Sequence, residues 1–444
     1  MEQSTARSRS RSREPDSRQL RHVLQAVPRE MDLQLRGIYH FCTFSGTGIP
    51  RLAVLHALGI LWSQGLRLQY RGGYHYENDN KCTKMSEAVN KRNPLQSQHR
   101  PDVSAFVRDV TGLSIRGQSK ILTTIAAPCT KISQGILHGT NNLSEVGPHA
   151  NPSSLFWTVH AGLVAASNTI PTKNNIVISE MVPAAMNNWE EQFTAAIGPP
   201  IELNALNGAE RRRFYRTSPK VQHPITQAPT NTNKMGEMLD GSTWPATATS
   251  NGARPPTLRS IYPHLLERQA LNHISAADSH TLKLFLLRNS NNTFRYAGPS
   301  HLAQWLELPD EVVSDIEAAY PCEQFPIDPI KKCTQHTWEQ KGTAMDSSMF
   351  HRCGVKVLCK NCSEAAELLG RAWNFSTAVA IVTAVLRTAF QETETANFTA
   401  FNNMCQHYCT SPCQFVHTLE QAKGRAEVAD HGTDFLERLP LCLI

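Results

Sequence analysis

The chain has 444 residues, of which 40% are hydrophobic and 18% are charged. This composition excludes a fully disordered protein, and the length exceeds the size at which one hydrophobic core stops growing, so we expect a large domain and a smaller lobe. Lysine and arginine exceed the acids by 44 − 38 = 6, a mild surplus that permits a polyanionic partner without demanding one.

The sequence has no signal-peptide pattern and no apolar run near the roughly 18 residues that span a bilayer. We therefore expect a soluble, intracellular protein that uses no membrane as a partner. In that compartment the 12 cysteines would be mostly free thiols rather than disulfides.

Half of the basic surplus lies in residues 1–21. This segment has arginines at positions 7, 9, 11, 13, 18 and 21 and acidic residues only at positions 2, 14 and 16. The alternating SRSRSR run is too polar to fold alone, so residues 1–30 are predicted to be a disordered tail. Such a tail is either simply solvated, or a nuclear address or nucleic-acid-tethering arm.

The first structured motif is a predicted strand, glycine turn and helix at residues 38–44, 45–48 and 50–58. This arrangement brings backbone N–H groups close to a ligand. A second predicted strand, at residues 66–76, is followed by Glu77 and Asn78, where an acidic residue can bind ribose hydroxyls.

The central motif is an apolar strand at residues 121–127 that stops at Pro128 and Cys129, before a polar, glycine-bearing loop. Cys129 is either a small buried hydrophobe or a nucleophile at the lip of a loop. Upstream, either Asp102 or Asp109 could end a third strand.

Beyond Cys129 we expect a helix at residues 152–166 and a buried strand at 175–182 that closes with Glu180. Arg211, Arg212 and Arg213 form either a solvated face or part of a site reached by a returning strand.

Residues 220–257 are rich in Pro, Thr, Asn and Gly, which predicts the start of a loop-rich lobe. Two helices split at Pro309 and a helical run at 365–390 interrupted at 370–374 follow. Cys359 and Cys362 have zinc-ligand spacing within an irregular stretch, but no second clean pair faces them, so we predict no metal site.

In this order the motifs resemble the DNA (cytosine-5) methyltransferases, most nearly the de novo eukaryotic branch, over roughly residues 40–390. Single motifs are weak, and their order carries the resemblance. The matching residues are Phe44-Ser45-Gly46-Thr47-Gly48, Glu77-Asn78, Pro128-Cys129, Ser133, Leu155-Phe156, Glu180-Met181-Val182, Arg211-x-Arg213, the segment 294–309 and the last motif at 368–374. Three positions depart from the family pattern: Met181 replaces an asparagine, Cys42 an aspartate and Ala209 a glutamine.

The resemblance implies an α/β fold, a Rossmann-like S-adenosylmethionine-dependent methyltransferase with a mostly parallel central sheet and a smaller, loop-rich target-recognition lobe. Residues 31–219 and 363–444 would form the catalytic domain, and residues 220–362 the recognition lobe with its cysteine-containing insertion.

The resemblance also implies methyl transfer to carbon 5 of cytosine through a covalent Cys129 adduct on a flipped base. Glu180 would contact ring N3, Arg213 would hold the base carbonyl, and Arg211 would support the site. The residues expected to bind the cofactor, S-adenosylmethionine, are Phe44, Ser45, Gly46, Thr47, Gly48, Ile49, Glu77, Asn78, Asp102, Arg371, Ala372 and Trp373.

The implied partner is double-stranded DNA and the implied location the nucleus, while a homo- or hetero-oligomer stays open. Two alternatives remain. One is the same chemistry on tRNA. The other is a catalytically silent regulator, which Met181 favours and the retained Cys129, Glu180 and Trp373 disfavour.

Overall fold

The computed structural model of the chain describes residues 36–93, 95, 97–115, 118–128, 131–133, 146–150, 153–168, 174–204, 211–221, 262–270, 275, 285–288, 294–321 and 359–390. The predicted tail at 1–30, Cys129, most of the segment 220–257 and the cysteines from Cys322 to Cys353 and from Cys405 to Cys413 lie outside these residues.

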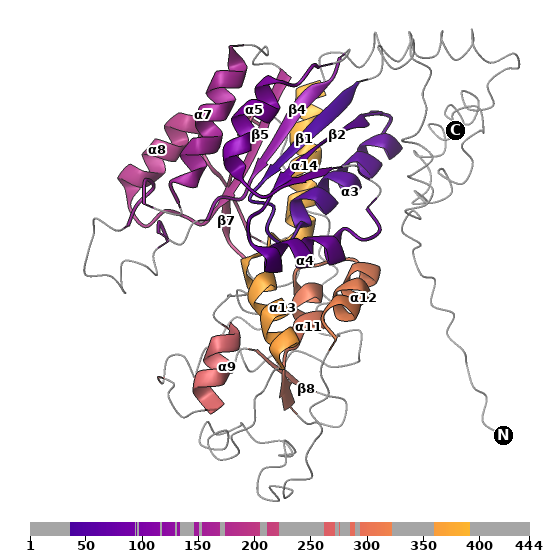
Figure 1. Cartoon of the computed structure of the whole chain (residues 1–444), viewed down its shortest axis with the longest axis vertical. Coiled ribbons are helices and arrows are strands. Elements are labelled where there is room, and N and C mark those ends of the chain that lie inside the picture. The colour runs from indigo at the N-terminus through magenta and orange to yellow at the C-terminus, as the bar shows by residue number, and fades with distance from the viewer. Residues whose placement is uncertain are drawn as a thin grey trace, which may run out of the picture.

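A seven-stranded sheet with the order β3-β2-β1-β4-β5-β7-β6 forms the centre of the described chain (Figure 1). All strands run parallel except β7, which is antiparallel to both of its neighbours. This confirms the expected mostly parallel α/β sheet. The strands are β1 Gly37–Thr43, β2 Gln69–Tyr76, β3 Gln98–Arg100, β4 Lys120–Ile125, β5 Asn175–Met181, β6 Ile201–Leu203 and β7 Arg213–Ser218.

The central strands are buried on both faces, which explains their continuous apolar runs. Every residue of β1 is buried, and so are all but the first residue of β4 and of β5. β4 ends at Ile125, two residues earlier than predicted, so Ala126 to Pro128 already belong to the connection that leads to Cys129.

Helices cover both faces of the sheet (Figure 1). One core cluster joins the sheet to α3 and α14, and a second joins it to α5, α7 and α8. The helices around the sheet are α3 Ile49–Ser63, α4 Asn80–Val89, α5 Phe106–Thr111, α7 Leu155–Ser167, α8 Asn187–Ile197 and α14 Phe375–Phe390, with the 3-10 helix η1 Val103–Ala105 before α5.

A second group of elements, called the second lobe below, lies beyond one end of the strands of the sheet (Figure 1). The predicted break at Pro309 is confirmed, because α11 ends at Trp305 and α12 begins at Asp310. The prediction that the chain is irregular as far as Cys362 is wrong in its last residues, because α13 begins at Lys360. The elements are α9 Tyr262–Ala270, the hairpin of β8 Leu286–Arg288 and β9 Phe294–Tyr296, α11 Pro299–Trp305, α12 Asp310–Ala319 and α13 Lys360–Arg371.

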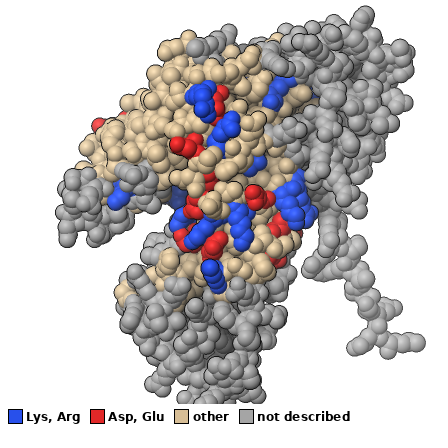
Figure 2. Space-filling view, in the orientation of Figure 1, with Lys and Arg blue, Asp and Glu red and all other residues tan. Residues whose placement is uncertain are grey.

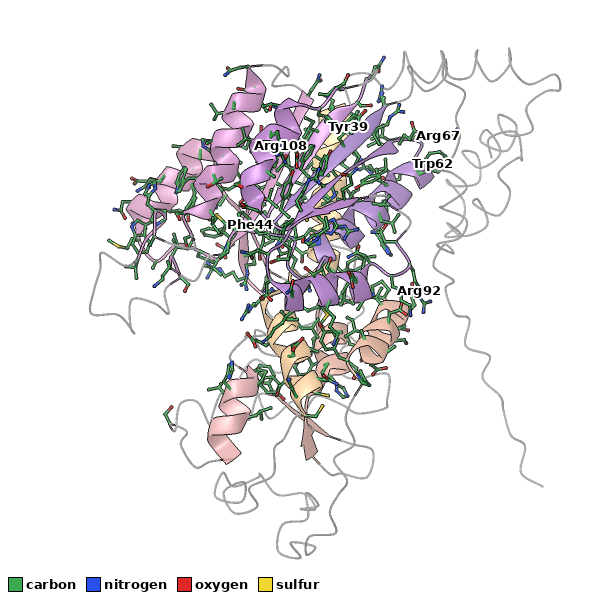
Figure 3. All side chains as sticks on the ribbon, in the orientation of Figure 1. Tyr39, Phe44, Trp62, Arg67, Arg92 and Arg108 are labelled. Carbon is green, nitrogen blue, oxygen red and sulfur yellow. The ribbon has the colours of Figure 1, made fainter. Side chains whose placement is uncertain are left out.

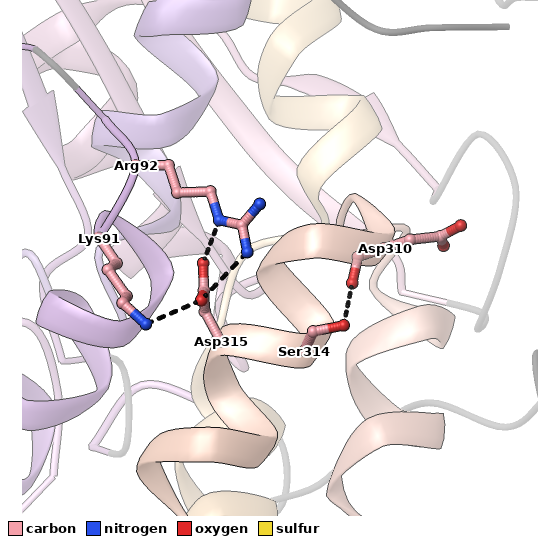
Figure 4. Close-up of polar contacts among 5 residues, drawn as sticks. All are labelled: Lys91, Arg92, Asp310, Ser314 and Asp315. Atoms are coloured by element: carbon pink, nitrogen blue, oxygen red, sulfur yellow. Dashed lines mark hydrogen bonds and ion pairs between the residues drawn. The ribbon is translucent and has the colours of Figure 1, made fainter. Parts of the chain in front are cut away.

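The two groups meet where α12 packs against α4. Asp315 of α12 binds Lys91 Nζ at 3.1 Å and Arg92 Nε at 2.7 Å, just after the end of α4 (Figure 4). Tyr320 follows α12, and the Lys84 ammonium lies 4.1 Å from the centre of its ring. The lobe therefore supports α4, the helix that follows Glu77.

By length and composition alone, Lys360–Phe390 could cross a membrane. The helix is broken between Arg371 and Phe375, and 67% of its most apolar window is buried within the molecule. A core helix of a soluble protein passes the same test.

Candidate functional site

Most of the predicted site residues that the structure describes lie at or near the ends of the parallel strands. The strand order reverses between β1 and β4, and ligands of open α/β sheets bind in the crevice outside the carboxyl ends of the strands at such a point. Figure 3 shows Phe44 at the end of the sheet that faces the second lobe, while Tyr39 lies toward the opposite end. The carboxyl ends of the strands therefore face α4 and the second lobe.

The glycine turn after β1 has a left-handed backbone at both of its glycines. Gly46 and Gly48 have φ values of 51° and 77°, in the left-handed region that glycine adopts freely. A Cβ on Gly48 would lie 2.4 Å from Asn90 Nδ2 and from Ser86 Oγ. Gly48 is the N-cap of α3. Pro50 in the first turn has no N–H group, and the Arg51 and Leu52 N–H groups donate to the Gly48 carbonyl at 3.1 and 3.3 Å.

The Glu77 carboxylate is fixed against this turn. The Gly46 N–H donates to its Oε2 at 2.7 Å, and the Asp79 N–H donates to its Oε1 at 3.0 Å. Burial raises the pKa of Glu77, opposed by these backbone hydrogen bonds. Each carboxylate oxygen retains a lone pair for a further donor, which suits a vicinal diol.

The neighbouring strand β3 places a second carboxylate at the same edge. Asp102 follows β3, is exposed, and accepts from the N–H and the Oγ of Ser104. Hydrogen bonds from Ser104 lower its pKa. The alternative, Asp109, is wrong: it lies in α5, where Tyr76 Oη and Arg100 Nε occupy it at 3.1 Å each. Asn78 is exposed beside Glu77.

The connection between α13 and α14 supplies the predicted Arg371, Ala372 and Trp373. Trp373 is 3% exposed, its ring lies edge-on to Tyr215 at 5.8 Å, and it shares a core cluster with Ile49 of α3. Arg371 is exposed and pairs with Glu367.

Several buried polar atoms of these elements have no hydrogen-bond partner among the described residues. They include Ser45 Oγ in the glycine turn, Arg51 Nε in α3, and Trp373 Nε1 and Asn374 Nδ2 between α13 and α14. A buried polar group without a partner costs free energy. Each atom is therefore suited to meet a ligand.

On the other side of the switch point, Glu180 of β5 forms an ion pair with Arg213 of β7. The Arg213 Nε lies 2.9 Å from Glu180 Oε1, and the two side chains are 14% and 10% exposed. Burial, and then the charge of Glu180, raises the pKa of Tyr215, which is opposite Glu180 in the ladder. The structure thus brings together the acid and one arginine of the predicted site.

Arg211 has a different environment from Arg213. Its N–H donates to Asn204 Oδ1 at 2.7 Å, and its Nη1 donates to the Gly370 carbonyl at 3.4 Å. It is buried, and these two contacts link the start of β7 to the end of α13.

The described residues around Cys129 approach the chain that follows Glu180. Before Cys129, the Pro128 carbonyl accepts from Ser153 Oγ at 2.9 Å. After it, the Ala185 N–H donates to the Ile132 carbonyl at 2.8 Å, and Ser133 forms an isolated bridge with Ala184. The ends of β4 and β5 are thereby held side by side.

Two further polar residues are buried in the sheet, and the sequence analysis did not single out the second, Arg216. Cys42 lies inside β1, where burial raises its pKa to about 11, so the thiol does not supply the negative charge of the aspartate that the resemblance places there. Arg216 in β7 is completely buried. An arginine at an inward position of a strand is a signal that could have drawn attention to it.

The cysteine pair at the start of α13 acts as a helix cap. Cys359 is the N-cap residue, and its Sγ accepts from the Cys362 N–H at 3.3 Å. Among the described residues, no group of three or more His, Cys, Asp or Glu side chains could hold a metal ion.

No protein-family model matches this sequence, and no curated protein matches it. Its function is therefore inferred from the residues and geometry described above.

Proposed function

We propose that this protein transfers a methyl group from S-adenosylmethionine to carbon 5 of cytosine in DNA. The observation that carries the proposal is the position of the Glu180–Arg213 ion pair. It lies at the same strand ends as the Glu77-bound glycine turn and as Pro128, which directly precedes Cys129.

The residues on the β1 and β2 side fit the methyl donor. The Glu77 carboxylate would accept from the ribose hydroxyls, and exposed Asp102 at the next strand end would accept from the adenine amino group. Ser45 Oγ and Trp373 Nε1, which lack partners among the described residues, would gain polar contacts. When bound, the donor supplies a methyl group made electrophilic by its sulfonium.

The residues on the β4, β5 and β7 side fit the pyrimidine ring. Carbon 5 of cytosine is a poor nucleophile, and addition of the Cys129 thiolate to carbon 6 would make it enamine-like. A bound cytosine would separate the Glu180–Arg213 ion pair. Arg213 would then bind the ring carbonyl, and Glu180 would contact ring N3. Carbon 5 would then take the methyl group and lose its proton to a general base. The electron pair of that C–H bond would re-form the ring double bond as the Cys129 thiolate leaves carbon 6.

A stacked base cannot reach these groups, so the target cytosine would be flipped out of the duplex. The carboxyl ends of the parallel strands face the second lobe, which would hold the DNA. On the face seen in Figure 2, Lys and Arg side chains are interspersed with Asp and Glu. Affinity for phosphates would therefore come from local basic groups rather than from a uniformly basic face. DNA as substrate implies the nucleus.

Two further candidates remain. The same chemistry on tRNA uses the same residues. A silent regulator is favoured by Met181, because methionine lacks the amide that the resemblance places at this position. The Met181 side chain is buried and accepts a hydrogen bond from Arg216.

One experiment separates these functions. The wild-type protein and Cys129→Ser are incubated with labelled donor and either 5-fluorocytosine duplex DNA or tRNA, and products are resolved under denaturing conditions. We expect a denaturation-resistant adduct with DNA for the wild type alone. An adduct with tRNA alone would favour the RNA enzyme, and no adduct with either would favour the regulator.

A further inference from the structure

The antiparallel strand β7 pairs with β5, and its side chains contact the end of β5 on both faces of the sheet. Successive residues of a strand point to opposite faces, so Arg213 and Arg216 point to opposite sides. Arg213 pairs with Glu180, whereas Arg216 Nη1 donates to the Sδ of Met181, the next residue, at 3.6 Å. Both arginines therefore act on neighbouring residues at the end of one strand.

Arg216 is among the largest completely buried side chains in the described structure, with 0% exposure. Its Nη2 also donates to Oε1 of Glu190, and its guanidinium lies 5.5 Å from the centre of the Phe193 ring. Burial lowers its pKa to about 10, so it remains charged at neutral pH. Desolvation offsets most of the attraction in a buried ion pair, so such a pair is weak evidence for a purely stabilising role.

The two partners of Arg216 lie at the two ends of one connection. Met181 is the last residue of β5, and Glu190 lies in the first turn of α8. The residues between them form the surface against which the chain after Cys129 pairs, through the Ala185 N–H to Ile132 carbonyl hydrogen bond and the Ser133–Ala184 bridge.

We propose that Arg216 is a positioning residue: by holding both ends of the connection between β5 and α8, it sets the place of the chain after Cys129 relative to Glu180. This inference rests on the proposed function. The resemblance places an asparagine at position 181, and in this chain the Met181 thioether instead accepts a hydrogen bond from Arg216. A planar guanidinium can bind two acceptors at once, which an ammonium does less well.

The first test compares Arg216→Met with Arg212→Met. Arg212 is an exposed arginine of the same segment, paired with Glu202. A displacement of about 1 Å in a catalytic geometry lowers rates about 100-fold, so we expect a fall of that order in adduct formation for Arg216→Met. The KM for the methyl donor should stay unchanged, because Glu77 and the glycine turn lie beyond β4. Arg212→Met should match the wild type, and Arg216→Lys should recover the rate only in part.

The second test separates positioning from folding. The double variant Glu190→Met with Arg216→Met removes both charges and keeps the volume, a change that is often neutral or stabilising. We expect a wild-type unfolding midpoint, slow adduct formation and faster hydrogen exchange of the Ala185 amide. A wild-type adduct rate in the double variant, or in Arg216→Met, would overturn the proposal.

Hydrogen exchange also keeps the two proposals distinct. If the wild type forms no adduct, the proposed function fails, while Arg216 can still be tested on its own. Unchanged Ala185 exchange in Arg216→Met would then overturn the positioning role, and faster exchange would support it.

Discussion

Glu77 determines the shape of the proposed donor site, because its two oxygens bind the glycine turn and the start of α4 at the same time. The Gly46 and Asp79 N–H groups both donate to this one carboxylate. An amide at this position would turn an NH₂ group toward one of these N–H groups and leave it without an acceptor.

We therefore expect Glu77→Gln to weaken binding of the methyl donor by about 10- to 100-fold, the range for losing a charged hydrogen-bond acceptor. Isothermal titration calorimetry with S-adenosylmethionine measures this directly. Glu202→Gln is the matched control, since Glu202 is partly exposed and pairs with Arg212 at the far edge of the sheet. Equal affinity of Glu77→Gln and the wild type would remove Glu77 from the donor site.

At the scale of an element, α3 contains two glycine positions with opposite requirements. Gly48 is the N-cap with φ 77°, and a Cβ there would lie 2.4 Å from Asn90 Nδ2 and Ser86 Oγ. Gly59 lies inside the helix, and a Cβ there would meet nothing within 4 Å. The same substitution at the two positions therefore tests the helix start against its middle.

We expect Gly48→Ala to destabilise the fold by roughly 1–3 kcal/mol, the range for a side chain held in a strained backbone conformation. Gly59→Ala should stabilise it by about 0.5–1 kcal/mol, because alanine has the higher helix propensity. Urea unfolding monitored by circular dichroism measures both values. A Gly48→Ala protein as stable as the wild type would show that the turn can rearrange.

Elements were more predictable from sequence than the contacts between them. The strands that end before Pro128 and at Met181, and the helix break at Pro309, follow from local apolar runs and backbone restrictions. The pairing of Glu180 with Arg213 and the burial of Arg216 depend on β7 inserting antiparallel between β5 and β6. The paired residues of β5 and β7 lie more than thirty positions apart, so no local pattern encodes their pairing.

At the scale of the whole molecule, Asp315 joins the lobe to the sheet by binding Lys91 and Arg92 (Figure 4). Burial opposes ionisation of Asp315, but the hydrogen bonds and charges of Arg92 and Lys91 outweigh it and lower its pKa below the ordinary value of 3.8. A carboxyl group with a lowered pKa in the folded state stabilises the fold above its unfolded pKa, and this contribution is lost as the pH falls through the folded value.

We expect Asp315→Asn to lower the free energy of unfolding at pH 7 by about 1 kcal/mol, the upper end of the range for ion pairs with exposed partners, because Lys91 and Arg92 are more than half exposed. The difference from the wild type should shrink below about pH 4, where the wild-type carboxyl group begins to take up its proton. Denaturant unfolding between pH 3 and pH 7 measures it, with Asp310→Asn on the exposed start of α12 as the control. Because α4 follows Glu77 directly, loosening this contact should also weaken donor binding. A variant that loses stability but binds the donor with unchanged affinity would show that the lobe supports α4 without acting on the donor site.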